Sequence, residues 1–304
     1  MGVARLLMVV VVALGAVGCR FEVAGLTGDS RSDGGAVDLG IDLAAPATVD
    51  LAGVDLLGPL VDLAPRPDLS DPCAPAPAPL TNGVNASCAI GNPPTVNGRI
   101  EEWVATPSYV LRSGAKDVGE SGFSGNAGDR DSNLSGAFQV RWDATALYVA
   151  VSVTDDLRAI AVTNTALWQG DSVEIYVSAT GAGQYGANDL QLVIAPNATG
   201  AYYRGDGVPR ALPAGVVAMT RNVGGAAGWE LEVSIPWSVI GGAGTLGRLM
   251  RFDVQLNDAD LSPTRERYLL WRSLQPAMCS ECSVIKCQPS CSTATFDSLQ
   301  LGGR

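Results

Sequence analysis

Hydrophobic and polar residues alternate in short runs from about residue 93 onward, and Gly, Asn, Asp and Pro separate the runs. Alternation with a period of two residues is typical of β-strands that have one buried and one solvated face. We therefore predict strands at residues 138–142, 147–153, 172–177, 190–194, 229–235, 250–256, 268–271 and 296–301, with a short helical turn at 236–240. Because no helical run exceeds a turn or two, residues 93–304 are predicted to form one all-β domain, an antiparallel, jelly-roll-like β-sandwich.

The run "SVEIYV" shows what the alternation assigns to each face of a strand. Val173, Ile175 and Val177 are predicted to point to the core, and Glu174 to the solvated face. Glu174 is then either an ordinary solvated strand residue or a group that contacts a ligand. Trp168 precedes the strand in a loop from which its ring can project.

Four other tryptophans have structural explanations. Trp142 ends one alternating apolar face and Trp229 begins another, so both are predicted to pack in the core. Trp103 and Trp237 are expected to cover the ends of the sandwich.

The first 19 residues have the length and flanks of an export signal. Arg5 precedes a short apolar stretch, and small residues lead to Cys19. The ending "AVGC" resembles a bacterial lipobox, in which the cysteine carries the lipid, although Ala16 stands where leucine is usual. The alternative is an ordinary secretory signal cleaved nearby. We expect an exported protein whose Cys19 anchors it to the cell envelope, at the outer membrane or cell surface, with the lipid as its only membrane contact.

Residues 20–92 differ in texture from the rest of the chain. They are rich in Asp, Leu, Pro and Ala, contain repeated Asp-Leu pairs and show neither helical nor strand periodicity. Such a segment is predicted to be a flexible tether whose charges repel one another. A calcium-binding aspartate repeat is the alternative, but the Gly-x-Asp period of such repeats is absent.

Composition excludes several functions. The net charge of −11 argues against nucleic acid as a partner, because affinity for phosphate comes largely from Lys and Arg. The chain contains no histidine, which excludes histidine-based zinc sites, Ser-His-Asp catalysis and histidine-ligated haem. We expect neither haem nor a nucleotide as a cofactor.

Six cysteines remain after Cys19, and an even number in an oxidising compartment predicts three disulfides. Cys73 and Cys88 are expected to pair with each other. The spacing C-x2-C-x4-C-x3-C of the last four would also suit zinc or an iron–sulfur cluster, but export favours disulfides. These four residues are Cys279, Cys282, Cys287 and Cys291.

Six sequence blocks, in order across roughly residues 95–301, resemble family 9 carbohydrate-binding modules. The blocks are "TVNGRIEEW", "VRWDATALYVAVSVTDD", "LWQGDSVEIYV", "GWELEVSIPWSVI", "FDVQLNDAD" with "YLLWRS", and "FDSLQL". The resemblance implies a non-catalytic β-sandwich that binds a sugar, often the reducing end of a glucan or xylan chain. Family modules accompany glycoside hydrolases such as xylanases, but no catalytic domain is recognised in this sequence.

The resemblance also implies a site. Trp168 and Trp271 would hold the sugar between their rings, and Glu174 and Gln255 would bond its hydroxyls, with Asn257 beside them. Aromatic rings cover the C–H face of a sugar, and carboxylates and amides bond its rim. Val193 is a departure from the family pattern, because it stands where sugar-binding members can carry an arginine.

Aspartates gather at the predicted strand ends, where calcium would find oxygen ligands. Asp155, Asp156 and Asp258 are the candidate ligands of a structural Ca²⁺. The alternative is that these residues bond the backbone of their own turns.

The leading hypothesis is a non-catalytic, surface-tethered carbohydrate-binding protein. A structural or interaction lipoprotein that keeps the sandwich without binding sugar is the alternative, motivated by Val193. A glycoside hydrolase would need two carboxyl groups across the scissile bond. Glu230 and Glu232 are candidates, but both are expected to face outward from a single strand.

Overall fold

The computed structural model describes residues 71–115, 119–121, 127–161, 163–182, 185–223, 228–271 and 296–304. The chain divides into two compact units, Met1–Asp62 and Leu63–Arg304, and every described residue belongs to the second. The predicted signal, Cys19, most of the tether and the four C-terminal cysteines lie outside the described residues. No helix in the described ranges has the length and apolar character needed to cross a membrane.

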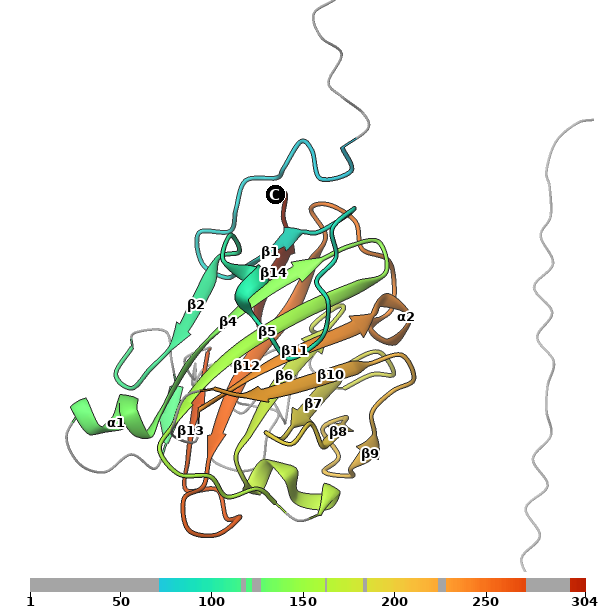
Figure 1. Ribbon diagram of the computed structural model, residues 1–304. Coiled ribbons are helices and arrows are strands. Elements are labelled where there is room, and N and C mark those ends of the chain that lie inside the picture. The colour runs from blue at the N-terminus through green and yellow to red at the C-terminus, as the bar shows by residue number, and fades with distance from the viewer. Residues whose placement is uncertain are drawn as a thin grey trace, which may run out of the picture. The chain divides into compact units, whose positions relative to one another are not determined.

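Two sheets face each other in the described unit (Figure 1). At the centre of the first sheet, β12 (Leu249–Asp258) pairs antiparallel with β6 (Ser172–Ser178) on one side and with β13 (Arg267–Leu270) and β14 (Asp297–Leu301) on the other. The sheet continues from β6 through β7 (Leu190–Ile194) and β8 (Gly200–Tyr203) to β9 (Arg210–Ala211), and β3 (Gly119–Ser121) adds to β13.

The second sheet has the order β10 (Val217–Asn222), β11 (Trp229–Pro236), β5 (Ala146–Asp155) and β4 (Leu134–Trp142), with β2 (Ser108–Leu111) beyond β4. Short helical segments connect the strands: η1 (Glu101–Trp103), α1 (Ala127–Asn133), η2 (Asn164–Gln169) and α2 (Trp237–Ile240). The predicted strands are therefore confirmed, and α2 confirms the helical turn after Pro236.

The predicted start of the domain at residue 93 is too late. Strand β1 (Val84–Cys88) pairs in parallel with β14 through its first residues and with β4 through its last. It therefore joins the edges of the two sheets and belongs to the sandwich rather than to a tether. The run "VNASC" alternates, but it has only five residues and follows a segment rich in Pro and Ala, so its strand signal is weak.

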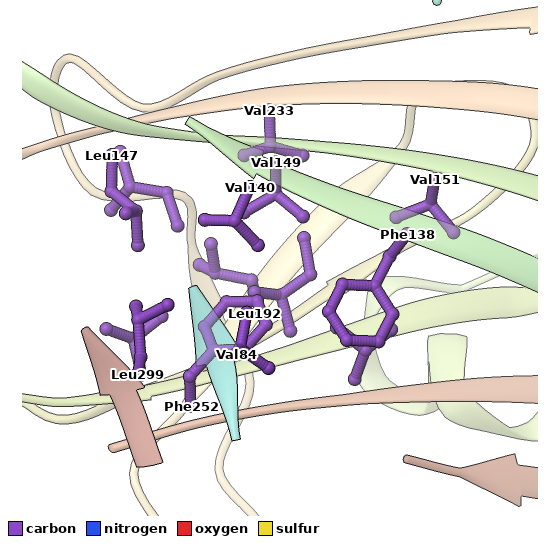
Figure 2. Close-up of a cluster of buried hydrophobic side chains, with 14 of the residues drawn as sticks. Val84, Phe138, Val140, Leu147, Val149, Val151, Leu192, Val233, Phe252 and Leu299 are labelled. Atoms are coloured by element: carbon purple, nitrogen blue, oxygen red, sulfur yellow. The ribbon is translucent and has the colours of Figure 1, made fainter. Parts of the chain in front are cut away.

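The core lies between the sheets, as the alternation predicts. Figure 2 shows Val140, Val149 and Val233 of the second sheet facing Leu192 and Phe252 of the first. Trp142 and Trp229 are fully buried in or beside this core, which confirms their predicted role. Both faces of β6 and of the second half of β12 are buried, and so are some outer positions of the second sheet, so these outer side chains need their own explanation.

Glu232 occupies such an outer position and is fully buried, which contradicts its predicted exposure. Its carboxylate accepts hydrogen bonds from the backbone N–H groups of Asn97 and Gly98 and from Nε1 of Trp103, each at 2.8 Å. Gly98 has φ +80°, and a Cβ there would lie 2.9 Å from the backbone of Thr220. Glu232 thus ties the "NGRIEEW" turn to the second sheet, and all its hydrogen bonds serve structure.

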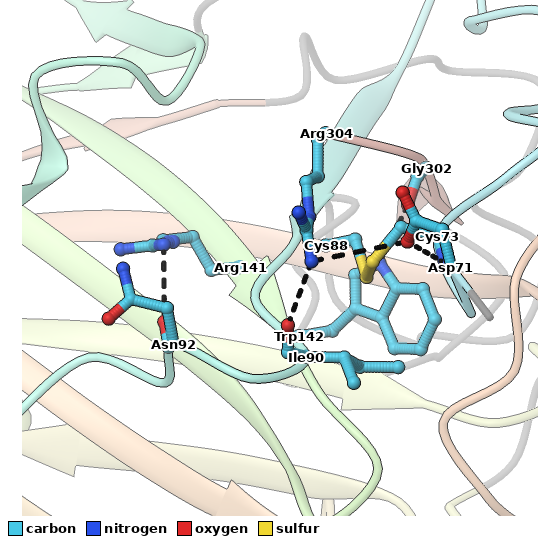
Figure 3. The surroundings of a disulfide bond; sticks show 9 residues. All are labelled: Asp71, Cys73, Cys88, Ile90, Asn92, Arg141, Trp142, Gly302 and Arg304. Carbon is cyan, nitrogen blue, oxygen red and sulfur yellow. Dashed lines mark hydrogen bonds and ion pairs between the residues drawn. A yellow bond between two sulfur atoms is a disulfide. The ribbon is translucent and has the colours of Figure 1, made fainter.

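Cys73 and Cys88 form a disulfide, as predicted, with a Cα–Cα distance of 5.9 Å (Figure 3). A pocket of about 410 Å³ lies beside it, lined in part by Asn92, Arg141 and Arg304. Arg141 and Arg304 donate to the backbone carbonyls of Asn92 and Ile90, respectively.

Candidate functional site

The outer face of the first sheet carries a cluster of polar side chains, here called the polar cluster. In the strand register Gln255 lies opposite Glu174, and Asn257 lies opposite Ser172. Paired residues of neighbouring strands project from the same face, so these side chains meet even though they are far apart in sequence. The polar cluster consists of Ser172, Glu174, Tyr176, Gln191, Gln255 and Asn257.

Glu174 is the centre of the polar cluster. Its Oε2 atom accepts hydrogen bonds from the hydroxyl of Tyr176 and from Nε2 of Gln191, both at 2.6 Å. Its Oε1 atom accepts from Nδ2 of Asn257 at 2.7 Å and from Nε2 of Gln255 at 3.1 Å. Burial, together with the charge of Glu174, raises the pKa of Tyr176 well above its usual value, so the phenol remains a donor.

The face of Glu174 is as predicted, but its solvation is not. The side chain is only 1% exposed, because η2 packs over β6 and Arg265 of the β12–β13 connection lies 3.7 Å from the carboxylate. A buried carboxylate needs hydrogen bonds or a paired cation in place of water, and here four hydrogen-bond donors replace the water. Glu174 therefore orients the other side chains of the polar cluster and is itself shielded from solvent.

Trp168 lies on η2, which packs across β6, β7 and β8. Its half-buried ring contacts an apolar cluster that includes Leu167, Val193 and Tyr203. Gly170 lets the backbone of residues 159–161 pack closely against the end of η2, because a Cβ there would lie 2.5 Å from the backbone nitrogen of Ala161. The ring of Trp168 therefore lies beside Val193, the neighbour of Glu174 in the strand register, and its part in ligand binding stays a prediction.

Arg265, in the β12–β13 connection, was not identified from the sequence. Its guanidinium lies over the ring of Trp168, 5.1 Å from the ring centre, and over that of Tyr268, at 5.2 Å. It donates to Oδ1 of Asn257 at 3.2 Å and lies 3.7 Å from Oε1 of Glu174. No motif singles out this arginine, because its role depends on how the connection folds back over β12.

Trp271 does not face Trp168, so the predicted pair of tryptophan walls is wrong. Its ring meets Phe138 and Tyr109 edge-on, with ring centres 5.4 and 5.5 Å apart, and packs against the core between the sheets. The backbone N–H of Trp271 bonds the carbonyl of Val254, a core-facing position of β12. Alternation along β13 thus sends Trp271 to the face opposite the polar cluster.

Val193 lies on the same outer face as Glu174, directly across from it on β7. It is fully buried against Trp168 and Leu167. The position that the family pattern assigns to an arginine is therefore part of the apolar support beneath the tryptophan.

A second candidate site is made by Asp155, Asp171 and Asp258, called here the aspartate trio. Each offers a carboxylate oxygen, and these oxygens lie within 4.8 Å of one another in buried surroundings. Asp155 ends β5, Asp171 precedes β6 and Asp258 ends β12, so the trio joins the two sheets. Asp156, predicted as a ligand, is exposed and accepts a hydrogen bond from Asn133 instead, and Asp171 takes its place.

The trio has the properties of a cation site. Burial, with repulsion between the carboxylates, raises the pKa of Asp155 to about 8 and that of Asp258 to about 7. Burial also raises the pKa of Asp171 to about 7. Both carboxylate oxygens of Asp258 are buried without a hydrogen-bond partner in the described structure. Unbonded, crowded carboxylate oxygens fit a calcium ion, which takes six to eight oxygen ligands.

Comparisons with known proteins agree with this fold. The family model described as carbohydrate family 9 binding domain-like matches residues 115–283. A family 9 carbohydrate binding module from Caldicellulosiruptor kristjanssonii, solved in complex with cellotriose, is 20% identical, with a TM-score of 0.54 over 73% of this chain and 94% of that chain. A second structure described in the same way, in complex with glucose, is 19% identical, with a TM-score of 0.53 over 72% and 96%. A comparison with curated proteins gives no match.

Proposed function

Because the chain belongs to the carbohydrate family 9 binding domain-like family, we propose that the outer face of its first sheet is a non-catalytic carbohydrate-binding site. The observation that carries this proposal is the polar cluster, with Trp168 and Arg265 at its rim. Both solved relatives named above hold a glucose-based sugar.

The chemistry of the rim suits a sugar. A half-buried indole offers apolar surface for the C–H groups of a sugar ring, and guanidinium N–H groups offer donors for its hydroxyls. Beneath them, Gln255 and Asn257 are held in place by Glu174. Both are almost fully buried, and Asn257 accepts a hydrogen bond from Arg265, so they help to fix the arginine at the rim. A donor fixed in this way loses little conformational entropy on binding, which raises affinity.

Isothermal titration of the folded chain with glucose, cellobiose, cellotriose and xylo-oligosaccharides tests the proposal. We expect heat with at least one of these ligands and a loss of affinity of at least tenfold in Trp168→Ala. Tyr202→Ala, which removes an aromatic ring from β8, is the matched control. No heat with any of the sugars would favour the structural or interaction lipoprotein instead.

Hydrolysis gains no support from the two acids considered for it. The carboxylate of Glu232 is fully engaged by the 97–99 turn and Trp103. Glu230 forms an ion pair with Arg221 at 2.6 Å. A reducing-sugar assay on xylan, with no release expected, tests this conclusion.

We also propose that the aspartate trio binds a structural Ca²⁺. The ion would supply positive charge between three carboxylates that otherwise repel one another. Thermal melting in calcium and in EDTA tests this, with a higher midpoint expected in calcium. Asp258→Asn should abolish the difference, whereas Asp206→Asn, at an exposed aspartate, should leave it intact.

The setting of the domain is a proposal from the sequence alone. We propose that the chain is exported and lipid-anchored through Cys19 to the cell envelope, where residues 20 to about 70 hold the sandwich away from the membrane. Expression in a bacterial host with radiolabelled palmitate should label the wild-type chain and leave Cys19→Ala unlabelled. An unlabelled wild-type chain found outside the cells would indicate ordinary secretion.

A further inference from the structure

We propose that Arg265 is the polar anchor of the carbohydrate site, meaning the side chain that donates hydrogen bonds to the sugar, and that it selects neutral sugars with adjacent hydroxyl groups. This inference rests on the function proposed above. The residue comes from the β12–β13 connection, on the opposite side of Glu174 from β7. It thereby supplies the guanidinium that Val193 does not.

The strand register shows why β7 supplies no cation at the position opposite Glu174, although Gln191 of the same strand donates a hydrogen bond to it. Val193 faces Glu174 across the β6–β7 pair and is fully buried beneath Trp168. A valine there supports the indole but leaves the carboxylate without a cation on that side. The cation arrives from the other side, where Nη1 of Arg265 lies 3.7 Å from Oε1 of Glu174.

The guanidinium of Arg265 is held in one orientation. Two rings contact it, those of Trp168 and Tyr268, and Oδ1 of Asn257 accepts one of its hydrogen bonds. The backbone N–H of Arg265 bonds Oε1 of Gln169, which adjoins Trp168 in η2. The β12–β13 connection and η2 therefore present the arginine and the indole together.

Arg265 also has donors to spare. A guanidinium carries five N–H groups in a fixed plane, and one of them is used in the bond to Asn257. Glu174 does not depend on this arginine, because four donors from Tyr176, Gln191, Gln255 and Asn257 already reach it within 3.1 Å. The side chain is 20% exposed, so part of it is accessible to a ligand that arrives at the rim.

Charge indicates which ligand these donors would take. The single positive charge of Arg265 is balanced by Glu174 beneath it, and the whole chain carries −11. An acidic sugar would find no unpaired cation here and would approach against a repulsive field. Adjacent hydroxyls on a neutral ring match two parallel N–H donors without adding charge, so neutral sugars are favoured.

The test is a set of titrations with cellotriose and glucose. We expect Arg265→Ala to weaken binding at least tenfold and Arg265→Lys to recover only part of the loss, because an ammonium lacks the planar fork. Arg210→Ala is the matched control, because that guanidinium also lies over an aromatic ring and pairs with a carboxylate, yet is remote from Glu174. Its affinity should stay within twofold of wild type.

A second arm changes the ligand instead of the protein. Glucose analogues that each lack one hydroxyl should lose affinity for the wild-type chain, and for one of them the loss should largely vanish in Arg265→Lys. Glucuronate should bind more weakly than glucose. This arm separates direct contact from a folding defect, because each protein serves as its own reference.

The outcomes distinguish this inference from the proposed function. If the wild-type chain binds sugar and Arg265→Ala matches it within twofold, the anchor is wrong while the carbohydrate site stands. Tighter binding by Arg265→Ala would mean that the arginine blocks the indole, and preferential binding of glucuronate would overturn the selectivity. A wild-type chain that binds no sugar would overturn the proposed function and the anchor together.

Discussion

At the scale of single residues, Glu174 is the group on which the candidate site depends. Its carboxylate is buried, accepts four hydrogen bonds and orients both Gln255 and Asn257. Loss of one member of such a network leaves its partners buried and unpaired, which costs more than the net contribution of the bonds themselves. The same residue therefore contributes both to folding and to the shape of the site.

Glu174→Ala is expected to lower the free energy of unfolding by about 3 kcal/mol or more, because it leaves four donors and a nearby arginine without their acceptor. Urea denaturation measures the change. Glu266→Ala, at an exposed position one residue after Arg265, is the control and should stay within about 0.5 kcal/mol. A loss below about 1 kcal/mol for Glu174→Ala would show that the network contributes little.

The aspartate trio predicts an unusual pH dependence in metal-free protein. The pKa values of Asp155, at about 8, and of Asp171 and Asp258, at about 7, are raised above their ordinary value near 3.8. Between about pH 4 and about pH 8 the folded state therefore binds more protons than the unfolded state, so the stability of the folded state falls as the pH rises across this range. Melting midpoints in EDTA across this range should decline, and calcium should flatten the decline. A rising midpoint in EDTA would contradict the raised pKa values.

At the scale of elements, the two segments that form the rim share one foundation. Asp171 follows η2, and its carboxylate accepts hydrogen bonds from the backbone N–H groups of Ala159 and Ala259. The backbone carbonyl of Asp258 accepts from Glu266, so the β12–β13 connection closes on the end of β12. A cation in the trio would thus brace the segments that carry Trp168 and Arg265.

Sugar binding is therefore expected to depend on calcium. Removing the ion with EDTA should weaken cellotriose binding several-fold without unfolding the sandwich, because the segments at the rim lose their shared support. Asp258→Asn should bind sugar with the same lowered affinity in calcium and in EDTA. Titration calorimetry measures the sugar affinities of the two proteins, and circular dichroism checks that they are folded. Equal affinities of the wild-type chain in calcium and in EDTA would show that sugar binding does not depend on the aspartate trio.

Sequence alone predicted the strands well but not how the loops pack over them. Alternation identified the strands and the side of β6 on which Glu174 lies, because the period of a strand is local information. It did not show that η2 covers Glu174, that Trp271 falls on the core face or that Arg265 folds back over Trp168. Those facts depend on strand register and on loop paths, which arise from contacts between distant parts of the chain.

At the scale of the whole described unit, the sandwich closes through β1. This strand pairs with β14 of the first sheet and β4 of the second, and the disulfide ties its last residue to Cys73. The carbonyl of Gly302 accepts a hydrogen bond from Trp142 at the same end (Figure 3). The polar cluster and the aspartate trio lie on other elements, so closure and ligand binding are separable.

Replacing both Cys73 and Cys88 with serine should therefore lower stability while sparing the site. The bridge spans 15 residues, for which loss of chain constraint corresponds to about 3 kcal/mol. The denaturation midpoint should fall, and cellotriose affinity should stay within twofold of wild type. An unchanged midpoint would show that the disulfide does not stabilise the sandwich. A large loss of sugar affinity in folded protein would show that closure and sugar binding are coupled.

A crystal structure of the chain with cellotriose tests the central claim most directly. It should show a sugar ring against Trp168, with a hydroxyl within hydrogen-bond distance of the Arg265 guanidinium and the Glu174 network intact beneath. Sugar bound beside Trp271, or in the pocket near Cys88 with the rim of the polar cluster empty, would contradict the claim.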